Sequence, residues 1–219
     1  MKDCRTIIES AFLEKVGKRP ERVVVRSPGR VNLIGEHTDY NEGFVLPASV
    51  DKVMVLVASP RADGICHFYA ADLKDEFSAA IASIERTQKG WPNYLLGVIE
   101  EMKKMGFNVP GCDVVFGGDI PIGAGMSSSA AVECGFVFAL NQLFDFGISR
   151  IDLVKLGQRS ENNFVGVNCG IMDQFVNIFG EDRKVLKIDC RSLAYEYFPF
   201  EREDLAIVLC ETEAKRSLA

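Results

Sequence analysis

The spacing of apolar residues predicts two helices and several strands in the first half of the chain. Near the N-terminus, apolar positions recur at helical spacing with charges between them, at Ile7, Ile8, Ala11, Phe12 and Val16. The valine-rich stretches 22–28 and 43–59, broken by Pro and Gly, predict strands, and 65–70 predicts another. From Asn93 the helical spacing returns and continues to Gly106, which is a typical helix stop.

The second half continues this mixture without a regular alternation of strand and helix. The pattern predicts a strand over 112–121 that enters a glycine-rich turn, followed by a helix over 127–144. A further helix should start near Ser149, whose hydroxyl can cap it in a capping-box-like pair with Asp152, and run to about Asn163. The remaining predictions are a short helix in 168–180 and strands over 184–190 and 205–211. We therefore expect one domain of the α+β class.

Composition and charge exclude several classes of protein. The chain has 219 residues, of which 47% are hydrophobic and 26% charged, enough for a sizeable core. A net charge of -6 with scattered Lys and Arg argues against nucleic-acid binding. Seven scattered cysteines without a C-x-x-C pair indicate reduced thiols. No signal-peptide pattern and no run of roughly 18 apolar residues is present, so we expect a cytoplasmic protein that does not enter a membrane.

The glycine-rich turn before the helix at 127–144 is a candidate anion site. Small residues let backbone N–H groups approach an anion, and a helix N-terminus adds unpaired donors. The serine hydroxyls that follow could donate to a phosphate or bind Mg²⁺. The sequence lacks the Gly-Lys-Ser/Thr of a P-loop and the G-x-G-x-x-G of a dinucleotide fold. A tight turn whose serines only cap the helix explains the pattern as well.

A polar run that includes Arg30, Glu36, His37 and Asp39 lies between two apolar stretches. Carboxylates and an imidazole on one short loop can bind several sugar hydroxyls, because each hydroxyl both donates and accepts hydrogen bonds. A solvated turn, a charge network that fixes the loop and a metal site are the alternatives. The metal alternative is weakened because His67 is the only other histidine.

Two further carboxylates stand at helix ends. Asp173 is near the start of the predicted helix in 168–180, where an ionised carboxylate is favoured, so helix capping alone could explain it. Glu161 is near the end of the preceding helix, where its charge opposes the helix dipole. This unfavourable placement indicates a cationic partner for Glu161.

Four segments together resemble the galactokinase family of the GHMP kinase superfamily. They are GRVNLIGEHTDYNEGFVLP (29–47), PIGAGMSSSA (121–130), CGIMDQF (169–175) and LCETEAKRSLA (209–219). The resemblance implies that residues 1–219 form a GHMP-kinase N-terminal domain, ribosomal protein S5 domain 2-like, with mixed β-sheets packed against helices. It also implies ATP- and Mg²⁺-dependent phosphorylation of the anomeric hydroxyl of D-galactose, giving galactose 1-phosphate and ADP.

The resemblance also implies roles for individual residues. The residues expected to bind the sugar are Glu36, His37, Asp39 and Gly170. Those expected at the reacting hydroxyl, as catalytic residues, are Arg30 and Asp173. Those expected to bind the phosphates of ATP are Gly123, Ala124, Gly125, Met126, Ser127, Ser128 and Ser129. Trp91 is expected near the adenine, and a position in the core is the alternative for it. Those expected to bind the magnesium ion are Ser128 or Ser129 and Glu161.

The chain departs from the family pattern at its C-terminal end. Galactokinases continue into a second domain, so we expect this chain to provide one wall of the active-site cleft and to have little activity by itself. Kinases for N-acetylgalactosamine or arabinose, and non-catalytic sensors that bind galactose and ATP, share the same motifs. The intact His37 and Asp39 favour galactose, and the intact serine loop favours an enzyme.

Overall fold

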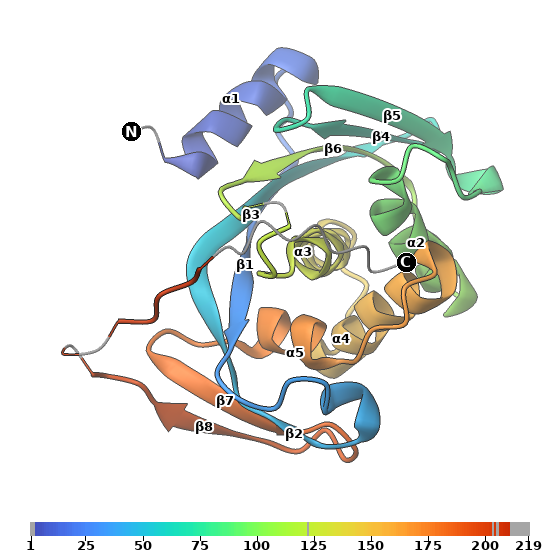
Figure 1. Ribbon diagram of the computed structural model, residues 1–219. Helices are drawn as coiled ribbons and strands as arrows, with labels where there is room; N and C mark the ends of the chain where they lie inside the picture. The colour runs from blue at the N-terminus through green and yellow to red at the C-terminus, as the bar shows by residue number, and fades with distance from the viewer. Residues whose placement is uncertain (1–2, 122, 203, 205, 211–219) are drawn as a thin grey trace.

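The described residues form two β-sheets around a central helix (Figure 1). The computed structural model describes residues 3–121, 123–202, 204 and 206–210. The α-helices are α1 (Cys4–Lys15), α2 (Pro92–Lys104), α3 (Ser128–Leu143), α4 (Arg150–Arg159) and α5 (Met172–Phe179). The strands are β1 (Val23–Asn32), β2 (Phe44–Val45), β3 (Pro47–Arg61), β4 (Ile65–Ala70), β5 (Asp75–Ala80), β6 (Gly111–Gly118), β7 (Lys184–Asp189) and β8 (Tyr195–Pro199). Short 3-10 helices span Asp39–Asn41 and Ile81–Ser83, and a π-helix spans Ser160–Val165.

The larger sheet is mixed, with strand order β1-β3-β6-β4-β5. Only the β4–β6 pair is parallel among its pairings. Side chains alternate across β3, so that Leu56 faces the main core around α3 and Val55 faces α1, where Ile8 and Phe12 are buried. Helix α3 is apolar around most of its surface, which is typical of a helix buried on all sides. Figure 1 shows α3 in the centre, between the larger sheet and helices α2, α4 and α5.

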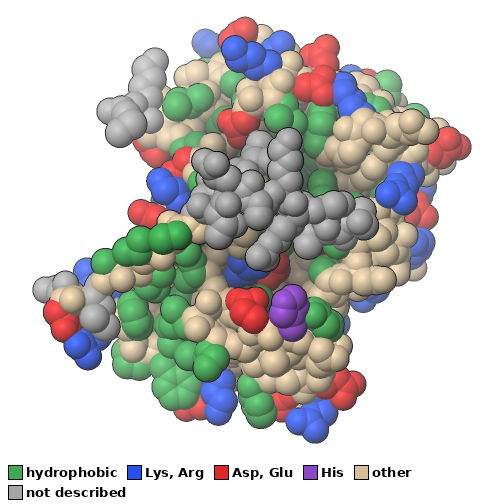
Figure 2. Space-filling model, in the orientation of Figure 1, with side chains coloured by type: hydrophobic (Ala, Val, Ile, Leu, Met, Phe, Trp, Pro, Cys, Tyr) green, Lys and Arg blue, Asp and Glu red, His purple; other side chains and the backbone are tan. Residues whose placement is uncertain are grey.

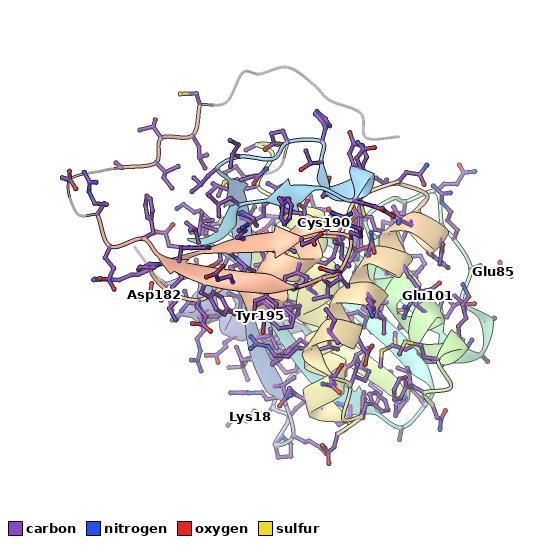
Figure 3. The ribbon with its side chains drawn as sticks, turned by 90° about the horizontal axis from the view of Figure 1, so that it is seen from below. Lys18, Glu85, Glu101, Asp182, Cys190 and Tyr195 are labelled. Atoms are coloured by element: carbon purple, nitrogen blue, oxygen red, sulfur yellow. The ribbon has the colours of Figure 1, made fainter. Side chains whose placement is uncertain are left out.

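The smaller sheet, in the order β2-β7-β8, covers α5. Tyr195 packs its ring against Phe175 and Phe179, and the Tyr197 hydroxyl donates to the Phe179 backbone oxygen at 2.6 Å. In the view from below (Figure 3), Tyr195 lies on this sheet, and Cys190 lies where β7 ends. These contacts pack the smaller sheet against Phe175 and Phe179 of α5, the helix that also carries Asp173.

The helix predicted from Ser149 has the expected cap but changes its geometry. The Ser149 hydroxyl accepts the backbone N–H of Asp152 at 3.3 Å, which confirms the predicted cap. The α-helical geometry ends at Arg159, and the chain continues as the π-helix, which contains Glu161. Gly97 of α2 makes room for this segment, because a Cβ there would lie 2.5 Å from the Ser160 hydroxyl.

Several sequence predictions of strands need correction. The stretch 43–59 forms two strands, because β2 pairs with β7 in the small sheet whereas β3 pairs with β1 and β6. Strands β5 and β8 were not predicted. The strand predicted over 205–211 is not formed in 206–210, and positions 205 and 211 lie outside the described residues. A lone strand leaves its backbone donors and acceptors unpaired, and no neighbouring strand pairs with 206–210 among the described residues.

None of the helices in the described part of the chain combines the length and the apolar character needed to cross a bilayer.

All seven cysteines are unpaired thiols.

Candidate active site

Arg30 of β1 and Asp173 of α5 form a two-point ion pair beside the glycine-rich loop. The Arg30 Nε donates to Asp173 Oδ1 at 2.7 Å, and Nη2 donates to Oδ2 at 3.0 Å. The third guanidinium nitrogen donates to the backbone oxygen of Gly125. The Ser127 hydroxyl also donates to Asp173. The segments around residues 30, 125 and 173 therefore meet at one place, although they are far apart in the sequence.

A break in the β1–β3 register brings Arg30 to this position. The pairing shifts between Pro28, which has no backbone N–H to donate, and Arg30. The Arg30 backbone N–H donates instead to the Met126 backbone oxygen at 3.2 Å. Gly29 allows this contact, because a Cβ there would lie 3.0 Å from the same oxygen. The end of β1 is thus attached to the glycine-rich loop.

The glycine-rich loop leaves the first turn of α3 without a side-chain cap. Gly123 and Gly125 have φ values of 82° and 73°, in the left-handed region that glycine tolerates. Ser127 occupies the N-cap position with φ 57° and makes no capping hydrogen bond, because its hydroxyl is directed to Asp173. The interpretation that this serine only caps the helix is therefore wrong. The uncapped N–H groups and the helix dipole suit an anion such as a phosphate.

The loop with Glu36 and His37 is held by hydroxyl and backbone contacts. The Thr38 hydroxyl contacts the backbone oxygens of Gly35 and Phe44, each at 2.7 Å. Glu36 accepts a hydrogen bond from the Asn32 amide at 3.0 Å, and His37 Nδ1 lies 2.6 Å from the Tyr40 hydroxyl. Both side chains are otherwise exposed to solvent. No group of three or more metal-binding side chains gathers anywhere in the described residues, this loop included.

Asp39 connects this loop to the start of α5. Its carboxylate accepts backbone N–H groups of Tyr40 and Met172, and a Cβ at Gly170 would overlap its Oδ2. Burial, reinforced by the nearby charge of Asp173, raises the pKa of Asp39 above its usual value. On the face shown in Figure 2, a histidine and acidic side chains lie side by side below the centre of the molecule. Two carboxylates close to one another suit a ligand with several hydroxyl groups.

Glu161 lies behind the serine loop, on the π-helix. It is only 4% exposed, and its carboxylate contacts the Ser129 hydroxyl and accepts the Gln174 amide N–H at 2.9 Å. Burial raises the pKa of Glu161. Ser129 is thus the serine whose hydroxyl contacts Glu161, and Ser128 occupies the first position of α3.

A second carboxylate, that of Glu133 on α3, lies against Glu161. Glu133 is fully buried, its Oε1 accepts the Ser160 hydroxyl at 3.4 Å, and its Oε2 has no partner. Burial, and then the charge of Glu161, raises the pKa of Glu133 far above its usual value. Within the described part of the chain, no Lys or Arg forms an ion pair with either glutamate. Hydroxyl and carboxylate oxygens without a cationic side chain are a donor set that fits Mg²⁺.

Trp91 lies at the end of β6 from which the glycine-rich loop departs. Its ring packs against Phe116 with centroids 5.6 Å apart, and its indole N–H donates to Asp75 Oδ2 at 2.9 Å. The side chain is half-buried. It therefore belongs to the rim of the core, and part of its surface is accessible to solvent.

Glu133 and Gln174 were not among the residues predicted from the sequence. The signal for Glu133 was available, because a single acidic residue within an otherwise apolar helix is costly unless it has a partner. Gln174 gave no such signal, because a glutamine beside Asp173 at the start of a helix is ordinary.

Two family profiles match the chain. Residues 10–60 match the galactokinase galactose-binding signature, and residues 93–181 match the GHMP kinases N terminal domain. The first range contains Arg30, Glu36, His37 and Asp39, and the second contains the serine loop, Glu161 and Asp173. The residues that converge in space thus come from both matched regions.

Individual relatives agree with this assignment. A galactokinase of Roseiflexus sp. (strain RS-1) is 43% identical over 212 residues, which are 97% of this chain and 54% of the relative. A galactokinase of Clostridium perfringens is 41% identical over 217 residues, 97% of this chain and 56% of the relative. The chain spans about half the length of the curated relatives it matches.

Solved structures extend the comparison. The crystal structure of Lactococcus lactis galactokinase complexed with galactose is similar, with a TM-score of 0.84 and 38% identity over 90% of this chain and 51% of that one. Mevalonate kinase of Methanococcus jannaschii shares the fold, with a TM-score of 0.68 and 17% identity over 85% of this chain and 58% of that one. The GHMP-kinase fold of the α+β class is therefore confirmed. The chain belongs to the galactokinase family and carries the N-terminal portion of a galactokinase.

Proposed function

We propose that this chain forms the sugar- and ATP-binding part of an enzyme that phosphorylates the anomeric hydroxyl of D-galactose, giving galactose 1-phosphate and ADP. The observation that carries the proposal is the Arg30–Asp173 pair, which joins the galactose-signature segment to the serine loop. The names of the relatives, and the galactose bound to the Lactococcus lactis enzyme, support galactose as the substrate.

The sugar in this proposal lies between Asp39 and Asp173. Asp39, held by backbone donors and close to Gly170, accepts sugar hydroxyls on one side. Glu36 and His37, which are exposed at the edge of the same loop, bind further hydroxyls. This arrangement leaves Asp173 and Arg30 at the reacting hydroxyl.

Asp173 chiefly orients the anomeric hydroxyl and takes its proton late in the reaction. Transition states of phosphoryl transfer are loose, so positioning and charge stabilisation outweigh early deprotonation of the nucleophile. Asp173 already receives Arg30 and Ser127 as donors, which fixes the orientation of its carboxylate. Arg30 stabilises the negative charge of the transferring phosphoryl group, which moves from ATP to the sugar oxygen.

The triphosphate of ATP lies along the 123–129 loop, where the uncapped N–H groups of α3 face it. Ser129 and Glu161 would hold Mg²⁺, and Ser128 is the alternative serine. The ion, when bound, neutralises charge on the phosphate oxygens. Trp91 packs beside the adenine. These residues act by holding the nucleotide in line with Arg30 and Asp173.

The relatives are about twice as long as this chain, and we propose that a second, C-terminal GHMP domain completes the cleft. Residues 1–219 then constitute the N-terminal GHMP domain, with little activity alone. We include a cytoplasmic location in this proposal, because all seven cysteines are unpaired thiols.

A coupled ADP-release assay across sugars tests the proposal in the full-length protein that carries this chain. We expect turnover with galactose that exceeds turnover with N-acetylgalactosamine or arabinose. Preferred turnover of one of those sugars would identify a different sugar kinase. Calorimetric binding of galactose and ATP without any ADP release would identify a non-catalytic sensor and contradict the kinase assignment.

A further inference from the structure

Gln174 lies next to Asp173 in the sequence but serves a different part of the site. Its side chain is fully buried on the first turn of α5. Asp173 is directed to Arg30 and Ser127, whereas Gln174 Nε2 donates to Glu161 Oε2 at 2.9 Å. We propose that Gln174 is a positioning residue that orients the Glu161 carboxylate for Mg²⁺. This inference rests on the proposed function, because it assumes that Glu161 binds that ion.

The orientation of the Gln174 amide is determined by its surroundings. Nε2 faces a carboxylate oxygen of Glu161 and also lies 3.7 Å from the Cys169 sulfur. A flipped amide would direct its oxygen at the carboxylate, where two acceptors repel each other. The Gln174 Oε1 is buried and accepts no hydrogen bond, and the amide also contacts the carboxyl of Glu133. The amide therefore acts here as a donor to Glu161.

This donor acts on one defined oxygen of the Glu161 carboxylate. Oε2 accepts the Gln174 amide at 2.9 Å and lies 3.4 Å from the Cys169 thiol, so both donors act on the same oxygen. The Ser129 hydroxyl contacts the same carboxylate. With Oε2 held on the α5 side, the orientation of the carboxylate that also contacts Ser129 and Glu133 is fixed. Hydrogen bonds of this kind orient metal-binding carboxylates, and their loss typically weakens metal affinity about 10–100-fold.

The placement of Gln174 links the two halves of the reaction site. One turn of α5 presents Asp173 to the sugar hydroxyl and Gln174 to the metal-binding carboxylate. Loss of the Gln174 donor should therefore affect the nucleotide-metal side and leave the sugar side intact. A purely structural role would instead affect both sides equally.

Gln158 offers a matched control for the experiment. It is a half-buried glutamine on α4 whose Nε2 donates to the backbone oxygen of Cys169 at 3.4 Å, and its side chain makes no hydrogen bond to Glu161. Methionine keeps the length of glutamine and removes the donor. The variants Gln174→Met and Gln158→Met thus make the same substitution. They differ in that only Gln174→Met removes a hydrogen bond from Glu161.

Binding of Mn²⁺ with a non-hydrolysable ATP analogue is measured in the full-length protein by the electron paramagnetic resonance of free Mn²⁺. Gln174→Met should weaken Mn²⁺ binding about tenfold or more, and Gln158→Met should change it less than about twofold. The KM for Mg²⁺·ATP should rise with Gln174→Met, while the KM for galactose stays within about twofold. Unchanged Mn²⁺ affinity in folded Gln174→Met would overturn the proposal while leaving the kinase function intact.

A measurement on the wild-type protein covers the case in which Gln174→Met does not fold. In ¹⁵N-labelled protein, the side-chain amide signals of Gln174 should shift when Mg²⁺ is added to the analogue complex, whereas those of Gln158 should not. No shift at Gln174 would overturn the positioning role. Absence of any Mn²⁺ binding to wild type would instead overturn the assignment of Glu161, and with it the proposal.

Discussion

The guanidinium of Arg30 contacts both carboxylate oxygens of Asp173, at 2.7 and 3.0 Å, across 143 positions of sequence. A bidentate pair fixes both the position and the orientation of the carboxylate. The Ser127 hydroxyl adds a further donor from the serine loop. The chain thereby brings a candidate proton acceptor, a cation and an anion-binding loop into contact.

Replacement of Asp173 tests the role of the proton acceptor. Asp173→Asn keeps the shape of the side chain but removes its charge, so we expect kcat to fall about 10²–10⁴-fold while galactose still binds. Steady-state kinetics and calorimetry on the full-length protein measure the two quantities. Asp182→Asn, at an exposed position, is the control. Turnover close to wild type in Asp173→Asn would eliminate an essential role in proton transfer.

Replacement of Arg30 by lysine tests the geometry of the ion pair. Lysine keeps the charge but cannot bind both carboxylate oxygens and the Gly125 oxygen together, so kcat should fall roughly 10–100-fold. Arg26→Lys, at an exposed position on the same strand, should leave kcat unchanged. Equal kinetics for the two variants would show that the fork geometry of Arg30 has no catalytic consequence.

Replacement of Glu161 tests the magnesium site. Glu161→Gln removes a cation-binding charge, so the KM for Mg²⁺·ATP should rise at least about tenfold, with galactose binding little changed. Glu100→Gln, half-buried on α2, serves as the control. Equal losses of nucleotide and sugar binding in Glu161→Gln would count against the assignment.

Replacement of Gly170 by alanine tests the close contact between Gly170 and the Asp39 carboxylate. A Cβ at this position would overlap Asp39 Oδ2, so Gly170→Ala should displace the carboxylate, raise the KM for galactose and cost about 1–3 kcal/mol of unfolding free energy. Urea denaturation measures that free energy. The double variant with Asp39→Ala should recover stability without recovering galactose binding. A double variant that remains as unstable as Gly170→Ala would locate the clash elsewhere.

The buried carboxyl of Glu133 should make the free energy of unfolding depend on pH. Burial raises the pKa of Glu133 in the folded chain above the ordinary carboxyl value of 4.5. Its contribution to the free energy of unfolding is therefore fully present below pH 4.5. That contribution is lost as the pH rises through the pKa of the folded chain. Glu133→Gln should flatten the fall in stability that begins as the pH rises above about 4.5, measured in the absence of metal. Urea denaturation at several pH values measures this fall. The same slope in wild type and variant would show that Glu133 does not titrate in that range.

Local patterns predicted much of the fold. The strand at 65–70 has the predicted bounds, and Ser149 caps α4 as expected, because both depend on neighbouring residues. Strand β5 escaped prediction because its sequence, DEFSAA, has few residues that favour strands. A strand was predicted over 205–211, but none forms in 206–210, because strand formation requires a partner that local sequence does not specify.

The site was predicted less completely, and for a physical reason. The resemblance to galactokinases pointed to Arg30 and Asp173, but only the folded chain shows that Ser127 binds Asp173 instead of capping α3. The contacts of Glu161 with Glu133 and Gln174 join three separate segments, and no spacing rule connects them. Tertiary contacts of this kind become visible only in coordinates.

The most direct test of the central claim is a crystal structure of the full-length protein with galactose and a non-hydrolysable ATP analogue. We expect the anomeric oxygen to lie within hydrogen-bond distance of Asp173, with Asp39 bound to other sugar hydroxyls and the γ-phosphate at the 123–129 loop. Galactose bound away from Asp173, or a triphosphate that does not reach this loop, would contradict it.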